Sequence, residues 1–124
     1  MTGNELRKLV KGKLYTLCQY VYYYLADKDA MYPHIVLTLS RASNYDIARD
    51  DVTIDVEIYA KGANAEAEAQ DLADAVEAMF NALNDPQEQL LPTFFVESIK
   101  QVPESDKSIR HKTVEITAQN YERR

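Results

Sequence analysis

Cysteine and glycine are both scarce in this 124-residue chain, which contains one cysteine and three glycines. A lone cysteine, Cys18, excludes an internal disulfide and a zinc site built from several thiolates. Three widely separated glycines cannot supply the glycine-rich turn of a P-loop or of a dinucleotide-binding motif. The nucleotide-binding enzymes that depend on those turns are therefore excluded.

Long hydrophobic runs are also missing. No window approaches the roughly 18 apolar residues of a membrane-spanning helix, so we expect no membrane contact. The opening stretch MTGNELRKLVKGKL lacks the apolar segment of a signal peptide. We therefore expect a soluble intracellular protein, and its length fits a single domain over residues 1–124.

Acidic side chains outnumber basic ones and concentrate in the middle of the chain. Residues 44–88 hold twelve acidic and two basic side chains, whereas residues 1–43 hold three acidic and six basic ones. A protein that binds nucleic acid would concentrate Lys and Arg on its binding surface. We therefore expect no sequence-specific nucleic-acid partner. The asymmetry fits either a solvated acidic helix face or a head-to-tail contact between copies, acidic patch against basic patch.

Two amphipathic helices are predicted. The first spans about residues 4–17, where leucine and valine recur at spacings of three and four. The second spans residues 64–83, with Asn64 as its N-cap and the sequence NDP as its stop signal. Its apolar stripe is expected to consist of Ala65, Ala69, Leu72, Val76, Met79 or Phe80, and Leu83.

The remaining regular segments favour strands. The tyrosine-rich run at residues 20–24, the stretch HIVLTLSRAS and the strictly alternating VTIDVEIYAKG each have strand composition. A hairpin follows in residues 91–124, and its second run places Val114, Ile116 and Ala118 on one face. The order α-β-β-β-α-β-β predicts an α+β fold, with a largely antiparallel sheet of about five strands and two helices packed on one face.

Chemistry-bearing constellations are not evident in the sequence. His34 and His111 fall in different strand regions without a second ligand at metal-like spacing, and we expect His34 to be structural. Asp50 and Asp51 are adjacent, but no further carboxylate completes a site, so we interpret them as solvated charges. We therefore expect no catalytic residue, no metal, no cofactor and no enzymatic activity.

Nine tyrosines and one basic loop are the candidate contact residues. Exposed tyrosine is enriched at protein interfaces, because its ring buries area while its hydroxyl keeps a polar partner. We expect Tyr23, Tyr45 and Tyr59 to serve in this way, the alternative being ordinary packing on a sheet. The loop PESDKSIRHK carries four basic side chains that we expect to contact acidic groups on a partner, namely Lys107, Arg110, His111 and Lys112. Arg110 and Lys112 are predicted near the start of the last strand, whose polar row is expected to face outward.

That loop also has two simpler interpretations. It could be a solvated turn without a partner. Arg110 could also pair with Asp106 across the loop and order only the turn.

Three segments together resemble a known family: MYPHIVLTL, RDDVTIDVEIYAKGANAEAEAQDLADAVEAMFNALN and LPTFFVESIKQVPESDKSIRHKTVEITAQNYER. They are similar to the small tail-completion, or tail terminator, proteins of long-tailed phages and prophages, including those with the lambda-type terminator fold. The resemblance runs from about residue 20 to the end of the chain. It rests on the YP before a strand, the helical DLADAV and the closing D-x-x-I-R-x-K and Y-E-R.

The resemblance implies an assembly role without catalysis or cofactor. Members form a hexameric ring on the end of the tail tube, stop its polymerisation and present a surface to the head connector. The implied partners are other copies of the chain, the tail tube protein and a head connector or stopper protein. The implied location is the virion tail, after synthesis in the cytoplasm of the bacterial host.

Two alternatives stay open beside this interpretation. The first is another small, multimeric protein of the head–tail connector, such as a stopper. The second is a non-viral α+β protein-binding module whose acidic helix meets a basic partner.

Overall fold

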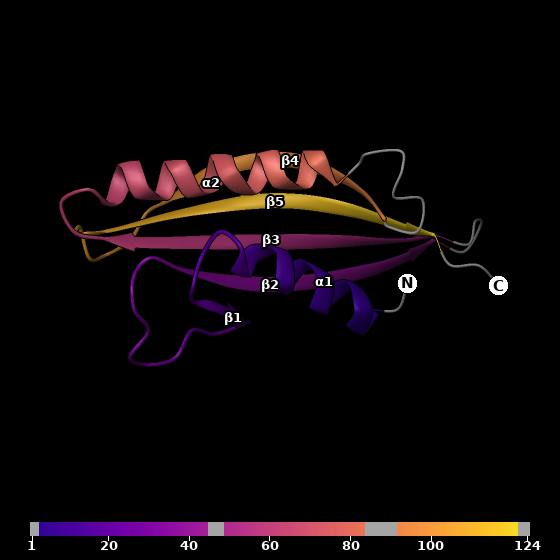
Figure 1. The fold of residues 1–124 in the computed structure, drawn as a ribbon, viewed down its shortest axis with the longest axis horizontal. Coiled ribbons are helices and arrows are strands. Elements are labelled where there is room, and N and C mark those ends of the chain that lie inside the picture. Colours follow the sequence, from indigo (N-terminus) through magenta and orange to yellow (C-terminus); the bar gives the residue numbers. More distant parts are fainter. Residues whose placement is uncertain (1–2, 45–48, 84–91, 122–124) are drawn as a thin grey trace.

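The computed structural model describes residues 3–44, 49–83 and 92–121, which form two helices and a five-stranded sheet (Figure 1). The predicted α+β class and the predicted element order are confirmed. In chain order the elements are α1 (Gly3–Tyr15), β1 (Val21–Tyr23), β2 (His34–Asn44), β3 (Arg49–Lys61), α2 (Ala65–Ala82), β4 (Thr93–Val102) and β5 (Ile109–Tyr121).

The sheet has the strand order β1-β2-β3-β5-β4. β1 pairs with β2 in parallel, and the other neighbouring pairs are antiparallel. The predicted hairpin is the pair β4–β5, whose register shifts between Val96 and Ser98. Because β5 lies between β3 and β4, the two edges of the sheet are β1 and β4.

One face of the sheet carries the hydrophobic core. The alternation in β3 buries Ile54, Val56 and Ile58 completely, and the register aligns Ile54 with Ile116 of β5. Figure 1 shows both helices on this face, α1 beside β1 and β2 and α2 along β4 and β5. The helices and the strands contribute to a single cluster of buried side chains, in which the α1 members are Leu6, Val10 and Leu14.

The first helix ends at Tyr15, two residues earlier than expected. The amides of Thr16 and Leu17 donate to carbonyls three residues back, at 3.1 and 2.9 Å, so the chain tightens into a turn there. No described helix is long and apolar enough to cross a membrane.

Helix α2 differs from its expected form in two details. Asn64 occupies the N-cap position, but its side chain makes no capping hydrogen bond, so the expected side-chain cap is wrong. The buried stripe is Ala65, Ala69, Ala73, Val76 and Phe80, whereas Leu72 is only partly buried. The apolar stripe therefore departs from the prediction at Leu72, where the next residue, Ala73, is the buried one, and Phe80 is the buried member of the predicted pair Met79 or Phe80.

We expect Leu72→Ala to lower the free energy of unfolding by about 1–2 kcal/mol, less than a fully buried leucine loses. Asp74→Ala is the matched change on the solvent side, where Asp74 accepts a 2.8 Å hydrogen bond from Gln70. It should cost no more than about 0.5 kcal/mol. Urea melts of the two variants measure the difference. Equal losses of stability would show that α2 does not turn Leu72 toward the sheet and Asp74 toward solvent.

Candidate functional site

The residues predicted to make contacts lie in separate places. Tyr45 lies outside the described residues. Tyr23 packs beneath α1, Tyr59 lies in the middle of the sheet face opposite the helices, and Lys107 is exposed in the β4–β5 turn. Arg110 and Lys112 meet at the beginning of α2. The structure therefore brings Arg110 and Lys112 together through a shared partner, Glu66, and joins Arg110 to the backbone of Lys107.

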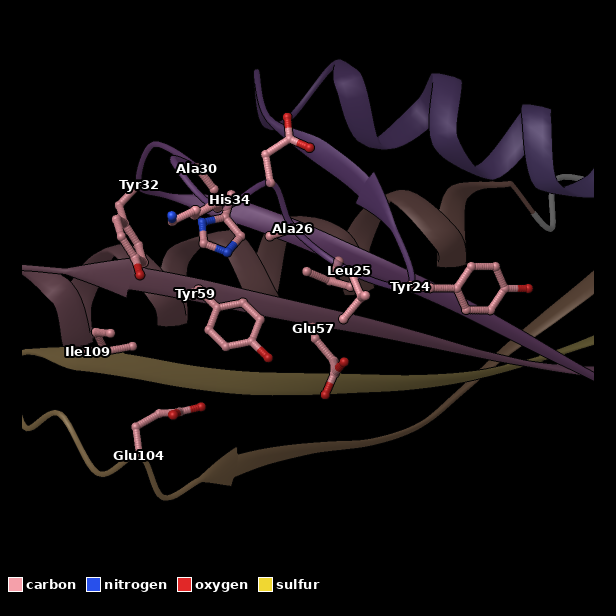
Figure 2. Close-up of a pocket in the computed structure, with 13 residues that line it drawn as sticks. Tyr24, Leu25, Ala26, Ala30, Tyr32, His34, Glu57, Tyr59, Glu104 and Ile109 are labelled. Carbon is pink, nitrogen blue, oxygen red and sulfur yellow. The ribbon is translucent and has the colours of Figure 1, made fainter.

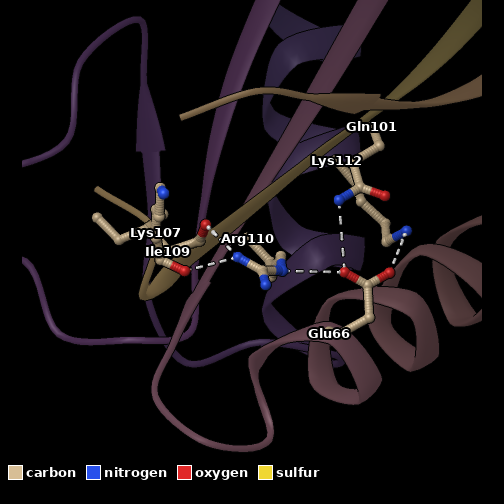
Figure 3. Close-up of polar contacts among 6 residues, drawn as sticks. All are labelled: Glu66, Gln101, Lys107, Ile109, Arg110 and Lys112. Carbon is tan, nitrogen blue, oxygen red and sulfur yellow. Dashed lines mark hydrogen bonds and ion pairs between the residues drawn. The ribbon is translucent and has the colours of Figure 1, made fainter. Parts of the chain in front are cut away.

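Glu66 in the first turn of α2 is the centre of a charged cluster (Figure 3). Its Oε1 lies 3.0 Å from Lys112 Nζ, and its Oε2 lies 3.3 Å from Arg110 Nε. The amide of Gln101 also donates to Oε2 at 3.5 Å. Two strands of the hairpin are thus attached to the start of a helix that precedes them in the chain.

The expected outward position of Lys112 is wrong. Residues of one parity share a strand face, and Lys112 has the parity of Val114, Ile116 and Ala118, which are fully buried. Its side chain is only 7% exposed and continues that core-facing row, so its ammonium reaches Glu66 rather than solvent. Its interface role remains a prediction.

Arg110 does not pair with Asp106, the alternative that the sequence left open, and its contact with a partner remains a prediction. It donates to the carbonyl of Lys107 at 2.7 Å and pairs with Glu66, although its side chain stays 40% exposed. Asp106 does not pair with it but accepts bonds from the amide and hydroxyl of Ser108, at 2.9 and 2.7 Å. Those two bonds hold the pKa of Asp106 below its ordinary value.

A row of aromatic rings crosses the sheet face opposite the helices (Figure 2). Tyr59 of β3 stacks between His34 of β2 and His111 of β5, with ring centroids 5.0 and 4.1 Å apart. Tyr22 and Tyr32 contact His34 at 5.9 and 4.8 Å. The two histidines, which the sequence leaves unrelated, are brought to the two sides of one tyrosine.

Carboxylates and carbonyls hold both imidazole rings. His111 Nδ1 lies 2.8 Å from Glu104 Oε1, and its Nε2 lies 3.3 Å from Glu57 Oε1. His34 Nδ1 lies 3.1 Å from the carbonyl of Met31, which can only accept, so this nitrogen carries the proton.

Burial governs the protonation of the other rings in this row. It lowers the pKa of His34, opposed in part by the Met31 carbonyl. It also raises the pKa of Tyr59 to about 12, and Glu57 and Glu104 add to that rise. Tyr59 therefore stays protonated at neutral pH. The described residues contain no group of three side chains that could hold a metal ion.

The loop after β1 lies over this row and leaves a depression of about 340 Å³ beside it (Figure 2). Glu57, Tyr59 and Glu104 line its floor and side. Tyr24 begins the loop with φ of 64°, a left-handed conformation uncommon for tyrosine. Tyr24 and Leu25 are 58% and 83% exposed, which gives the depression an apolar rim of the kind found at protein contacts.

A second depression of about 340 Å³ lies beside α1 on the opposite side of the sheet. The Nζ of Lys11 lies 4.5 Å from the ring centre of Tyr23, and the guanidinium carbon of Arg7 lies 4.9 Å from it. The hydroxyl of Tyr23 donates to the Arg7 carbonyl at 3.0 Å. Tyr23 therefore supports cations of its own chain, which the sequence alone did not indicate.

Comparison with known proteins finds a likeness in structure alone. No protein-family model matches the chain, and no curated protein matches it. A solved structure of the virion of a native gene transfer agent (GTA) particle contains a chain with a similar fold, at a TM-score of 0.63 and 13% sequence identity. The likeness covers 91% of this chain and 92% of that chain, so the two share their fold over nearly their whole length.

Proposed function

We propose that this chain is a structural protein of a phage-type virion, and within it the terminator that caps the tail tube. The observation that carries the proposal is the fold shared with a chain of a gene transfer agent virion over 92% of that chain. The motif resemblance to tail terminators supports the finer assignment independently of the fold. The chain then acts by assembly, without catalysis or a bound cofactor.

In this role the protein forms a ring, hexameric as the family resemblance implies, on the open end of the tail tube. The ring occupies the surface to which the next tube subunit would bind, and so ends polymerisation. Its other rim meets the head connector or stopper protein. A closed ring needs a heterologous contact, in which one surface of a subunit binds a different surface of the next. The exposed apolar rim of the β1–β2 loop and the charged helices offer such unlike surfaces.

Deleting the gene from an inducible phage or prophage that carries it tests the role. We expect tails that exceed normal length and filled heads that remain unjoined, because nothing then stops tube growth. Electron microscopy of the lysate measures both, and a plasmid copy of the gene should restore normal virions.

The same experiment separates the alternatives. Loss of a stopper or connector protein would leave tails of normal length beside separate heads. Loss of a binding module outside the virion would leave normal particles, and that result would contradict the proposed function.

A further inference from the structure

The two helices carry opposite charge. α1 holds Arg7, Lys8, Lys11 and Lys13 against a single acid, Glu5. α2 holds five acidic side chains and no basic one: Glu66, Glu68, Asp71, Asp74 and Glu77. Opposite charge on two elements of one chain favours contact between copies when the elements do not meet each other.

Within residues 3–44, 49–83 and 92–121, the cations of α1 have no acidic partner. Among the described ion pairs none involves Arg7, Lys8, Lys11 or Lys13. Arg7 and Lys11 lie over the ring of Tyr23, and Arg7 Nε is buried without a hydrogen-bond partner in the described structure. Lys8 is exposed beside them. The depression that these side chains line is therefore basic, with the ring of Tyr23 beneath the cations, and it suits a carboxylate. We call it the basic surface of α1.

The surface of this helix is also open to close approach. Gly12 is exposed, and a Cβ built there would meet nothing within 4 Å. Tyr15, next along the same surface, is 48% exposed. A second helix laid against α1 would meet no bulky side chain at Gly12 and a tyrosine ring at Tyr15.

The acids of α2 face solvent. Glu66 is engaged by Arg110 and Lys112, but in the described part of the chain no cation pairs with the other four. Glu68, Asp71 and Asp74 are exposed, and Asp74 accepts a hydrogen bond from Gln70 of the same helix. These three form the acidic surface of α2.

The positions of the helices determine how copies would meet. Both lie on one face of the sheet, with α1 at the β1 edge and α2 over β3, β5 and the edge strand β4 (Figure 1). A second copy placed beside the first with its sheet in the same orientation brings its α1 next to the neighbour's α2. Repetition of this contact with a constant rotation gives a ring.

We propose that the basic surface of α1 binds the acidic surface of α2 on a second copy of this chain. This proposal deepens the ring of the proposed function, but the contact itself needs no tail tube to be tested. Lys8 and Lys11 meet Asp71 and Asp74 of the neighbour, and Tyr15 lies at the edge of the contact. High salt weakens it, since its charges lie at the surface.

Paired charge reversals test the contact. One variant carries Lys8→Glu with Lys11→Glu, and the other carries Asp71→Lys with Asp74→Lys. Each variant alone should self-associate about a hundredfold more weakly than the original chain, because attraction becomes repulsion at each contact. A mixture of the two should associate again, since every contact then joins unlike charges. Sedimentation velocity of each protein and of the equimolar mixture, at low and at high salt, measures this.

Matched controls change the same number of charges elsewhere. Lys61→Glu with Lys100→Glu, and Glu97→Lys with Glu115→Lys, alter side chains of the strands that lie outside both helices and line neither depression. These should associate like the original chain. Thermal melts of all variants show whether each is folded.

Three results would overturn the contact: an original chain that stays monomeric at millimolar concentration and low salt, reversed variants that associate normally, or a mixture that does not recover. None of these bears on tail length. Normal tails after gene deletion would refute the tail-capping role while leaving the measured contact intact.

Discussion

Replacing Phe94 with alanine should lower the free energy of unfolding by about 3–5 kcal/mol. Phe94 is 1% exposed on the helix-covered face of β4, and its ring meets that of Phe80 edge to face, with centroids 5.1 Å apart. The substitution removes both the buried area and the aromatic contact between β4 and α2. Denaturant melts at constant temperature give the change directly.

The adjacent phenylalanine is a matched control. Phe95 lies on the opposite face of the same strand and is 44% exposed, so Phe95→Ala should cost less than about 1 kcal/mol. Phe94→Leu keeps most of the volume and gives an intermediate case if the alanine variant does not fold. Similar losses of stability at positions 94 and 95 would show that β4 does not bury Phe94 while exposing Phe95.

Removing the carboxylate of Glu66 should have the next largest effect. Glu66→Ala leaves the ammonium of Lys112, whose side chain is 7% exposed, without its 3.0 Å partner. We expect a loss of about 2–3 kcal/mol, below the 3–5 kcal/mol of a fully buried pair because water reaches the half-exposed Glu66.

Removing the cation should be far less costly. Lys112→Met places an unbranched apolar side chain in a row that already continues Val114 and Ile116, so we expect a change within about 1 kcal/mol. Glu66→Ala combined with Lys112→Met should therefore recover most of the stability lost in Glu66→Ala alone. A double variant no more stable than Glu66→Ala would contradict the view that an unpaired buried charge is the cause. Chemical melts of the three proteins complete the cycle.

The elements of the fold could be predicted because their signals are local. The alternation of Val52, Ile54, Val56 and Ile58 repeats every second residue, and one face of the strand is buried accordingly. The buried stripe of α2 could be predicted only approximately, because Leu72 and Ala73 are adjacent in the helix and either could face the sheet. In the structure the smaller side chain, Ala73, is the one that packs against the strands. Close approach of α2 to the strands explains why alanine is buried there.

For Lys112, the alternation of side chains along β5 already indicates a position that faces the core. Counting back by twos from Val114 places it on the core-facing row, which the helices cover. That the partner is Glu66 could not be predicted, because it depends on how α2 lies over the sheet. The stacking of His34, Tyr59 and His111 could not be predicted for a related reason. It depends on the register between strands, and the alternation within each strand does not reveal that register.

The place of β5 in the sheet has a consequence for biosynthesis. β5 follows the other four strands in the chain but lies between β3 and β4. As the chain leaves the ribosome, β3 and β4 therefore emerge without the strand that joins them, and α2 has only part of the surface it will cover. The sheet is completed only after β5 has emerged. β5 then pairs with its neighbour in the chain, β4, and with β3, a pairing that is distant in sequence and hence slow to form. A nascent or prematurely ended chain without β5 thus lacks the strand that joins β4 to the rest of its sheet.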